Sequence, residues 1–116
     1  EAAKRPCYIG YGSAAQLEEL RHWASRDEAT CFAISTRDGL IATENADDPA
    51  ELSLQEAAKL AEKMAQQLAE LHCSKIVLYS AKVGERPSIQ TVLGCLHLAA
   101  AQAGGLKVVH EEAWES

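Results

Sequence analysis

The sequence predicts an α/β fold with a mixed sheet, in which an antiparallel β-meander is followed by α-β-α-β and the helices pack on the sheet. Two amphipathic helical stretches occupy the second half of the chain, and each is followed by a short apolar run. In the first half, an Asp-Gly turn separates two apolar runs, a pattern typical of a hairpin. The 116 residues are enough for one domain with a core of its own.

We divide the chain into an N-terminal arm and lead-in (residues 1–18), a single α/β domain (residues 19–112) and a C-terminal tail (residues 113–116). The first six residues show no periodicity and predict an extended arm. Tyr8 to Gly12 fits either a short strand or a surface lead-in that carries two tyrosines. These tyrosines are candidates for stacking on a base, although packing against the domain is the better interpretation.

Residues 13 to 24 carry two conflicting signals. Ser13-x-x-Gln16 has the form of a capping box, and Leu17 and Leu20 share a helical face after it. By contrast, the stretch from Leu20 to Trp23, followed by a polar turn, is typical of a strand. We predict a short helix from residue 13 to about 19 and a strand from about 20 to 24.

The next elements form the predicted hairpin. Cys31 to Ser35 is an apolar run with polar residues on both sides, and Leu40 to Thr43 is its expected partner. Asp38-Gly39 lies between them and tolerates the positive φ angles of a tight turn. The acidic stretch from Glu44 to Glu51 lacks the ligand spacing of a calcium loop, so we interpret it as a solvated connection.

The central helix begins at a second capping box, Ser53-Leu54-Gln55-Glu56. Its apolar residues recur at spacings of three and four and predict one buried stripe. The members of this stripe are Leu54, Ala57, Ala61, Met64, Leu68 and Leu71. Ile76 to Tyr79 follows as a continuous apolar run, which predicts a strand buried on both faces.

The last helix is predicted to start at Pro87 and to stop at Gly104-Gly105. Its apolar face consists of Ile89, Val92, Leu93, Leu96, Ala99, Ala100 and Ala103. Leu106 to Val109 is the final predicted strand, and Trp114 in the acidic tail is expected to dock on the domain.

The composition argues against several functions. A net charge of −6 and a pI near 5.1 disfavour a surface that coats nucleic acid. The four cysteines form no C-x-x-C pair, which favours buried, reduced thiols, and the four histidines share no ligand spacing. The sequence contains no apolar run long enough to span a membrane and no signal-peptide pattern. We therefore expect no enzymatic activity, no cofactor, no metal, no small-molecule substrate and no membrane partner.

The order of elements resembles the large-subunit ribosomal protein eighteen family, whose members typically bind 5S rRNA. Cys31 to Thr43 is similar to the family's hairpin, and Glu56 to Leu78 is similar to its helix and following strand. The third similar segment is Ile89 to Val108, which closes in Ala-Gly-Gly-Leu-Lys-Val. The resemblance spans roughly residues 19 to 112, and its motifs also fit the related small-subunit protein eleven family.

The resemblance implies a structural constituent of the large ribosomal subunit, with rRNA and neighbouring ribosomal proteins as partners. A mitochondrial member, in which protein contacts replace lost RNA contacts, would account for the acidic chain and for a start at Glu1 without Met. The mitochondrial matrix is then the expected location, with the cytoplasm or another organelle as the alternative. The cations outside the two main helices that could contact phosphates are Lys4, Arg5, Arg21, Arg26, Arg37, Lys82 and Arg86.

A different class of function fits the same sequence. The chain could be a free-standing α/β protein-interaction domain, with Glu44 to Glu51 and Glu111 to Ser116 as its contact surfaces. The arrangement of charge discriminates between the two classes. Basic residues should gather on one face if RNA is the partner and should be scattered if it is not.

Overall fold

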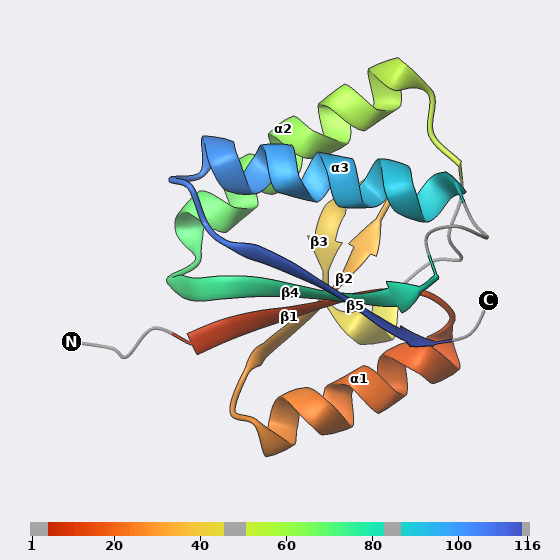
Figure 1. Ribbon diagram of the computed structural model, residues 1–116, viewed down its shortest axis with the longest axis vertical. Coiled ribbons are helices and arrows are strands. Elements are labelled where there is room, and N and C mark those ends of the chain that lie inside the picture. Colours follow the sequence, from red (N-terminus) through yellow and green to blue (C-terminus); the bar gives the residue numbers. More distant parts are fainter. Residues whose placement is uncertain (1–4, 46–50, 83–86, 115–116) are drawn as a thin grey trace.

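The computed structural model describes residues 5–45, 51–82 and 87–114. A five-stranded sheet with the strand order β3-β2-β1-β4-β5 lies between two helical layers (Figure 1). In chain order the elements are β1 (Arg5–Tyr11), α1 (Ala14–Arg26), β2 (Thr30–Ser35), β3 (Gly39–Ile41), the 3-10 helix η1 (Thr43–Asn45), α2 (Leu54–Glu70), β4 (Cys73–Ala81), α3 (Pro87–Gln102) and β5 (Val108–Trp114).

The predicted α/β class with a mixed sheet is confirmed. β2 and β3 form an antiparallel pair, whereas β1 is parallel to both β2 and β4, and β4 is parallel to β5. The antiparallel part is therefore one hairpin and not a longer meander, because a helix connects β1 to β2. α2 and α3 cover one face of the sheet, and α1 covers the other (Figure 1).

The strand predicted from about residue 20 to 24 is wrong, because these residues form the second half of α1. The capping box at Ser13 and Gln16 starts the helix as expected. Leu17, Leu20 and Ala24 then all face the sheet and are buried. A strand would turn alternate residues to opposite faces, so only a helix buries all three side chains on one side.

Residues 5–11, which we placed in the arm and lead-in, form the central strand of the sheet. The α/β domain therefore starts before residue 19. Cys7, Ile9 and Tyr11 point into the α2–α3 layer, and Gly10 faces α1. The sequence signal for this strand is weak, because the run is short, contains two glycines and has polar neighbours. The strand is nevertheless buried, because other strands lie on both of its sides.

The predicted hairpin is confirmed, with Ile34 paired to Leu40 and Ser35 paired to Gly39. Gly39 has φ of 77°, the conformation that favours glycine at this turn. The free side of β3 is covered by Gln67 of α2, whose amide accepts a hydrogen bond from the Leu40 N–H (2.8 Å) and donates one to the Leu40 carbonyl (2.9 Å). This side chain thus takes the place of a neighbouring strand at the edge of the sheet.

The larger core lies between the sheet and the α2–α3 pair. From α2 it contains Ala61, Met64 and Leu68, as predicted. Leu54, which the periodicity placed in the same stripe, is 91% exposed because it is the first residue of the helix and lies beyond the sheet. From α3 the buried residues are Ile89, Val92, Cys95, Leu96, Ala99 and Ala100.

A smaller core lies under α1. Leu17 and Leu20 contact the sheet together with Ala33 and Trp114. Three aromatic rings lie together here, those of Trp23, Tyr79 and Trp114. The two tryptophan rings are nearly parallel, and their centroids are 6.0 Å apart. Trp114, expected to dock from a tail, is buried at the end of β5, which continues to residue 114.

Candidate nucleic-acid interface

The predicted phosphate-contacting cations do not gather at one place. Arg5 begins β1 and Arg26 ends α1, which puts both at the edge of the sheet where the parallel strands start. Arg37 in the β2–β3 turn and Lys82 after β4 lie at the opposite edge. Arg21 is exposed in the middle of α1. Lys4 and Arg86 lie outside the described residues.

Arg5 is joined at its edge by three basic side chains that the sequence interpretation missed: His72, Lys75 and Lys107. Arg5 pairs with Cys73, the first residue of β4. Ile76 pairs with Val108 and donates its N–H to the carbonyl of Lys107 (2.8 Å), so Lys75 and Lys107 lie side by side on neighbouring chain segments. Parallel strands bring their starts to one edge of a sheet, and this is why residues far apart in sequence meet here.

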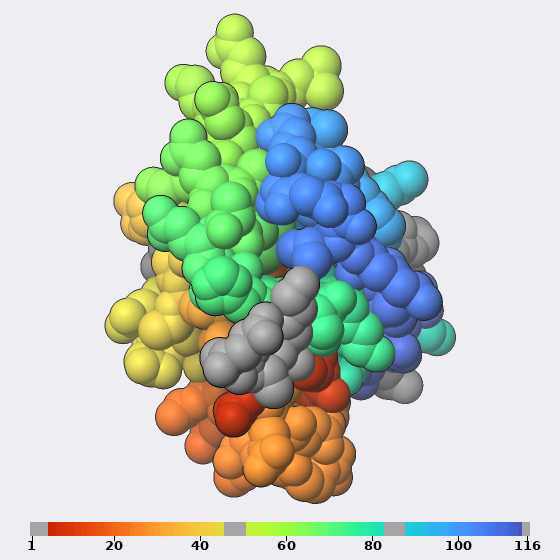
Figure 2. All heavy atoms as spheres, turned by 90° about the vertical axis from the view of Figure 1, so that its left-hand side faces the viewer, coloured from red at the N-terminus to blue at the C-terminus, as the bar shows by residue number. Residues whose placement is uncertain are grey.

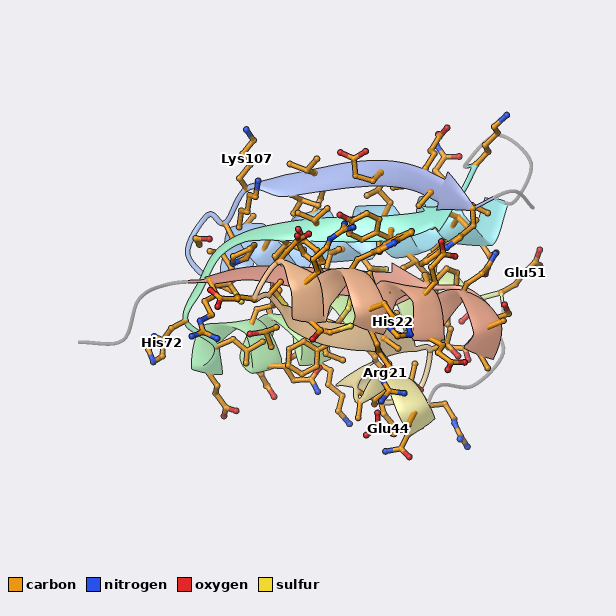
Figure 3. The ribbon with its side chains drawn as sticks, turned by 90° about the horizontal axis from the view of Figure 1, so that it is seen from below. Arg21, His22, Glu44, Glu51, His72 and Lys107 are labelled. Atoms are coloured by element: carbon orange, nitrogen blue, oxygen red, sulfur yellow. The ribbon has the colours of Figure 1, made fainter. Side chains whose placement is uncertain are left out.

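We refer to Arg5, His72, Lys75 and Lys107 as the basic edge. All four are exposed. Figure 2 looks directly onto this side of the molecule, and Figure 3 shows His72 and Lys107 projecting at the same end of the sheet. The neighbouring acid in the chain is Glu70, the last residue of α2. With Arg26 at the end of α1, four cations lie at this edge beside the three carboxylates of Asp27, Glu28 and Glu70, which leaves a small positive excess in a chain whose net charge is −6.

Arg26 contributes less to this potential than its position suggests. Its Nε lies 3.5 Å from Asp27 Oδ1 in an exposed ion pair. The other oxygen of the same carboxylate, Oδ2, accepts a hydrogen bond from the Tyr8 hydroxyl (2.9 Å). Asp27 therefore offsets the charge of Arg26, and Tyr8 is held by a contact within the domain rather than being free to stack on a base.

A second group of cations lies at the other end of α2. Arg37, Lys59 and Lys63 line a shallow hollow of about 240 Å³ together with Glu56. Asp38 follows Arg37 in the turn, so three cations here face two carboxylates. Further acids lie at this end of the sheet, at Glu51 before α2 and at Glu111 and Glu112 in the second half of β5. Acids therefore match or outnumber cations at this edge, whereas cations are in slight excess at the basic edge.

Two grooves border α1. One, of about 350 Å³, is lined by Cys31, Arg21 and Glu44, and an adjoining one of about 440 Å³ is lined by Glu18, Arg21, His22 and Ser25. Each groove combines cations with a carboxylate. Burial raises the pKa of Cys31 to about 11, so its thiol stays protonated at neutral pH and is a poor nucleophile.

Ser80 and His110 form a polar pair that no sequence motif predicts. The Ser80 Oγ lies 2.6 Å from His110 Nε2 and donates to the Ala81 carbonyl (3.0 Å). A serine beside a histidine can act as a nucleophile, but this serine is completely buried and cannot reach a substrate. The pair instead satisfies two polar groups between β4 and β5.

Within the described ranges, no group of three or more His, Cys, Asp or Glu side chains is arranged to hold a metal ion. No helix in the same part of the chain has the length and apolar character needed to cross a membrane. Comparison with known proteins returned no matching family model, no similar curated protein and no similar solved structure.

Proposed function

We propose that this protein is a structural constituent of the large ribosomal subunit in mitochondria, and that it contacts rRNA through the basic edge. The observation that supports this proposal best is the convergence of Arg5, Lys75 and Lys107 at the start of three neighbouring chain segments. The resemblance to the large-subunit ribosomal protein eighteen family is the reason for proposing the ribosome as the assembly. No catalytic step is part of the proposed role.

The scatter of the cations inferred from the sequence favours the interaction domain, whereas the basic edge favours RNA on one side. Lysine and arginine contacts to phosphate supply the sequence-independent part of RNA affinity, and the local potential matters for them more than the net charge does. The acids on the rest of the surface would repel RNA from other faces, which orients the domain. Those faces remain available for neighbouring ribosomal proteins.

The proposed contact set differs from the set of cations inferred from the sequence. Arg5 is retained, and Lys75, Lys107 and His72 are added. Arg37 and Lys82 lie at the opposite edge, so one flat stretch of RNA cannot contact them and Arg5 at the same time.

Gradient sedimentation of the tagged protein from cells tests the proposal. We expect the wild type to co-migrate with the large ribosomal subunit at low and at high salt. The double variant Lys75→Glu with Lys107→Glu should shift to the position of the free domain, first at high salt, because phosphate contacts weaken as salt rises.

The matched control is Lys59→Glu with Lys63→Glu. It makes the same change in net charge on exposed positions of α2, away from the basic edge. We expect this variant to sediment as the wild type does. A wild type that sediments as a free domain at both salts would rule out the ribosomal role, and equal losses in both variants would rule out the basic edge as the contact.

A further inference from the structure

Helix α3 carries no Asp, Glu, Lys or Arg. Its sixteen residues lack all four types, although these types make up 24% of the chain. The neighbouring helix α2 differs, because its exposed side carries Glu56, Lys59, Glu62, Lys63 and Glu70. A helix that faces only water usually has charged side chains on its outer side, as α2 does. The centres of protein–protein interfaces, by contrast, are depleted of charged residues.

The exposed residues of α3 form one stripe. The buried side of the helix packs on α2 and on the sheet (Figure 1), and the Cys95 Sγ donates to the Ala57 carbonyl of α2 (3.3 Å). The exposed residues recur at spacings of three and four, which places them together on the outer side. We refer to these residues, Gln90, Gly94, His97, Leu98, Ala101 and Gln102, as the α3 stripe.

The middle of the α3 stripe has a protruding side chain and a notch one helical turn apart. Leu98 is 50% exposed, whereas Gly94 has no side chain, and a Cβ added there would meet nothing within 4 Å. The two residues are four positions apart and therefore lie about 6 Å from each other along the helix axis. In an antiparallel pair of α3 helices, a two-fold axis midway between them brings each Leu98 level with Gly94 of the other copy. The α3 stripe is thus complementary to itself.

The ends of the α3 stripe fit the same arrangement. The same two-fold axis brings Gln90 of one copy level with Gln102 of the other. A glutamine amide both donates and accepts, so two such side chains can hydrogen-bond to each other without any charge. A parallel pair would instead place Leu98 against Leu98 and would leave a gap between the two Gly94 residues.

The absence of charge favours a second copy as the occupant. A symmetric contact uses the same surface on both subunits, so a stripe with a net charge would face the same charge on the other copy. The α3 stripe avoids this repulsion because none of its residues is an Asp, Glu, Lys or Arg. A surface that binds a charged partner would need the opposite charge, which this stripe does not offer.

We propose that the α3 stripe is a self-association surface, through which two copies of this chain form a symmetric dimer with antiparallel α3 helices. A standard interface buries about 800 Å² per partner, and a single pair of helices buries less, so the dimer should dissociate on dilution. The proposal goes beyond the ribosomal role and does not depend on it, because the α3 stripe shares no residue with the basic edge.

Analytical ultracentrifugation of the purified full chain over a series of concentrations tests the dimer. We expect the mass to rise from 12.5 kDa towards twice that value as the concentration increases. Leu98→Lys should raise the dimer dissociation constant about tenfold or more, because a charged side chain would have to enter the notch. A monomer at every concentration up to about 1 mM would overturn the proposal.

The matched control is Leu54→Lys, which changes an exposed leucine of α2 outside the α3 stripe. This variant should dimerise as the wild type does, and an equal loss in both leucine variants would also overturn the proposal. The variant Lys75→Glu with Lys107→Glu should dimerise normally as well. The dimer and the RNA contact can therefore fail separately.

Charges at the two ends of the α3 stripe test its orientation. Gln90→Glu with Gln102→Lys puts opposite charges together in an antiparallel dimer and like charges together in a parallel one. We expect this variant to dimerise at least as tightly as the wild type, and Gln90→Glu with Gln102→Glu to dimerise more weakly. The reverse order of these two variants would contradict the antiparallel arrangement. Circular dichroism of each variant checks that the exposed substitutions leave the fold intact.

Discussion

The two faces of the sheet are packed in different ways. The α2–α3 face is covered by two helices that also pack on each other, and its core consists mainly of aliphatic side chains and alanines. The other face has a single helix, α1, and its core has Leu17 and Leu20 beside the buried Trp114 and several aromatic rings that are only partly buried. Trp114 Nε1 is buried on this side and has no hydrogen-bond partner within the described structure.

The side chains on the two faces of this sheet therefore differ in how far they can rearrange after a mutation. Aliphatic side chains enclosed between two helices and a sheet have little room to relax around a cavity. Rings at the border of a small cluster can tilt into a cavity and bury surface that was exposed to solvent. We therefore expect the α2–α3 face to determine most of the stability and the α1 face to tolerate more change.

Truncating one leucine on each face tests this expectation. We expect Leu68→Ala in α2 to lower the free energy of unfolding by about 3–5 kcal/mol and Leu20→Ala in α1 by about 2–3 kcal/mol. Both leucines are fully buried, so the difference reports how far each surrounding can relax. Urea denaturation curves measure it. An equal or larger loss for Leu20→Ala would break the comparison.

Adding a methyl group probes the opposite limit. A Cβ at Gly10 on β1 would come within 2.5 Å of Leu20 Cδ2 and 2.6 Å of Leu17 Cδ2, whereas one at Gly94 on α3 would meet nothing within 4 Å. We expect Gly10→Ala to lower the free energy of unfolding by about 1–3 kcal/mol, because the α1 layer is tight at this one point.

The matched change, Gly94→Ala, should raise the free energy of unfolding by about 0.5–1 kcal/mol, because alanine favours the helix at an exposed position. Thermal unfolding of both variants gives the signs. A stable Gly10→Ala protein would mean that α1 moves away easily, which would sharpen the distinction between the faces.

The smallest effects concern the helix starts. Ser13 caps α1 and Ser53 caps α2 in the same geometry, but the returning side chain is the neutral Gln16 in α1 and the charged Glu56 in α2. We expect Ser13→Ala and Ser53→Ala each to cost about 1 kcal/mol. Denaturation at neutral pH measures the two losses, and a much smaller loss for Ser13→Ala would show that α1 frays without consequence.

Only the α2 cap should respond to acid. The Ser53 N–H lowers the pKa of Glu56 below its ordinary 4.5. The folded state thus favours the carboxylate, so this contribution to stability is present above pH 4.5 and is lost as the pH falls through the lowered pKa. The difference between wild type and Glu56→Gln should shrink in this range, whereas Gln16→Ala should show no such trend.

Local signals in the sequence predicted the starts of the helices well. Ser53 with Glu56 and Ser13 with Gln16 are capping boxes in the structure, and Pro87 begins α3. The Asp-Gly turn sits where the hairpin needs it, with Gly39 at positive φ. These features depend on atoms within about four residues of one another, which is why a single sequence contains them.

The candidate site was predicted only in part. Arg5 was inferred as a phosphate contact, but Lys75 and Lys107 were not, since nothing in their own neighbourhoods shows that they face each other. Their proximity follows from the pairing of Ile76 with Val108 in the β4–β5 register. Strand order is a property of the whole sheet, and no local pattern encodes it.

The sequence by itself determined the α/β class, the hairpin, the helix starts and the two main helices with most of their buried faces. Only the tertiary structure decided that residues 5–11 form the central strand and that residues 20–24 are helical. It also decided which cations share an edge. Capping, turn geometry and periodicity act over a few residues. Which strands become neighbours, by contrast, depends on how the whole chain buries its apolar surface at once.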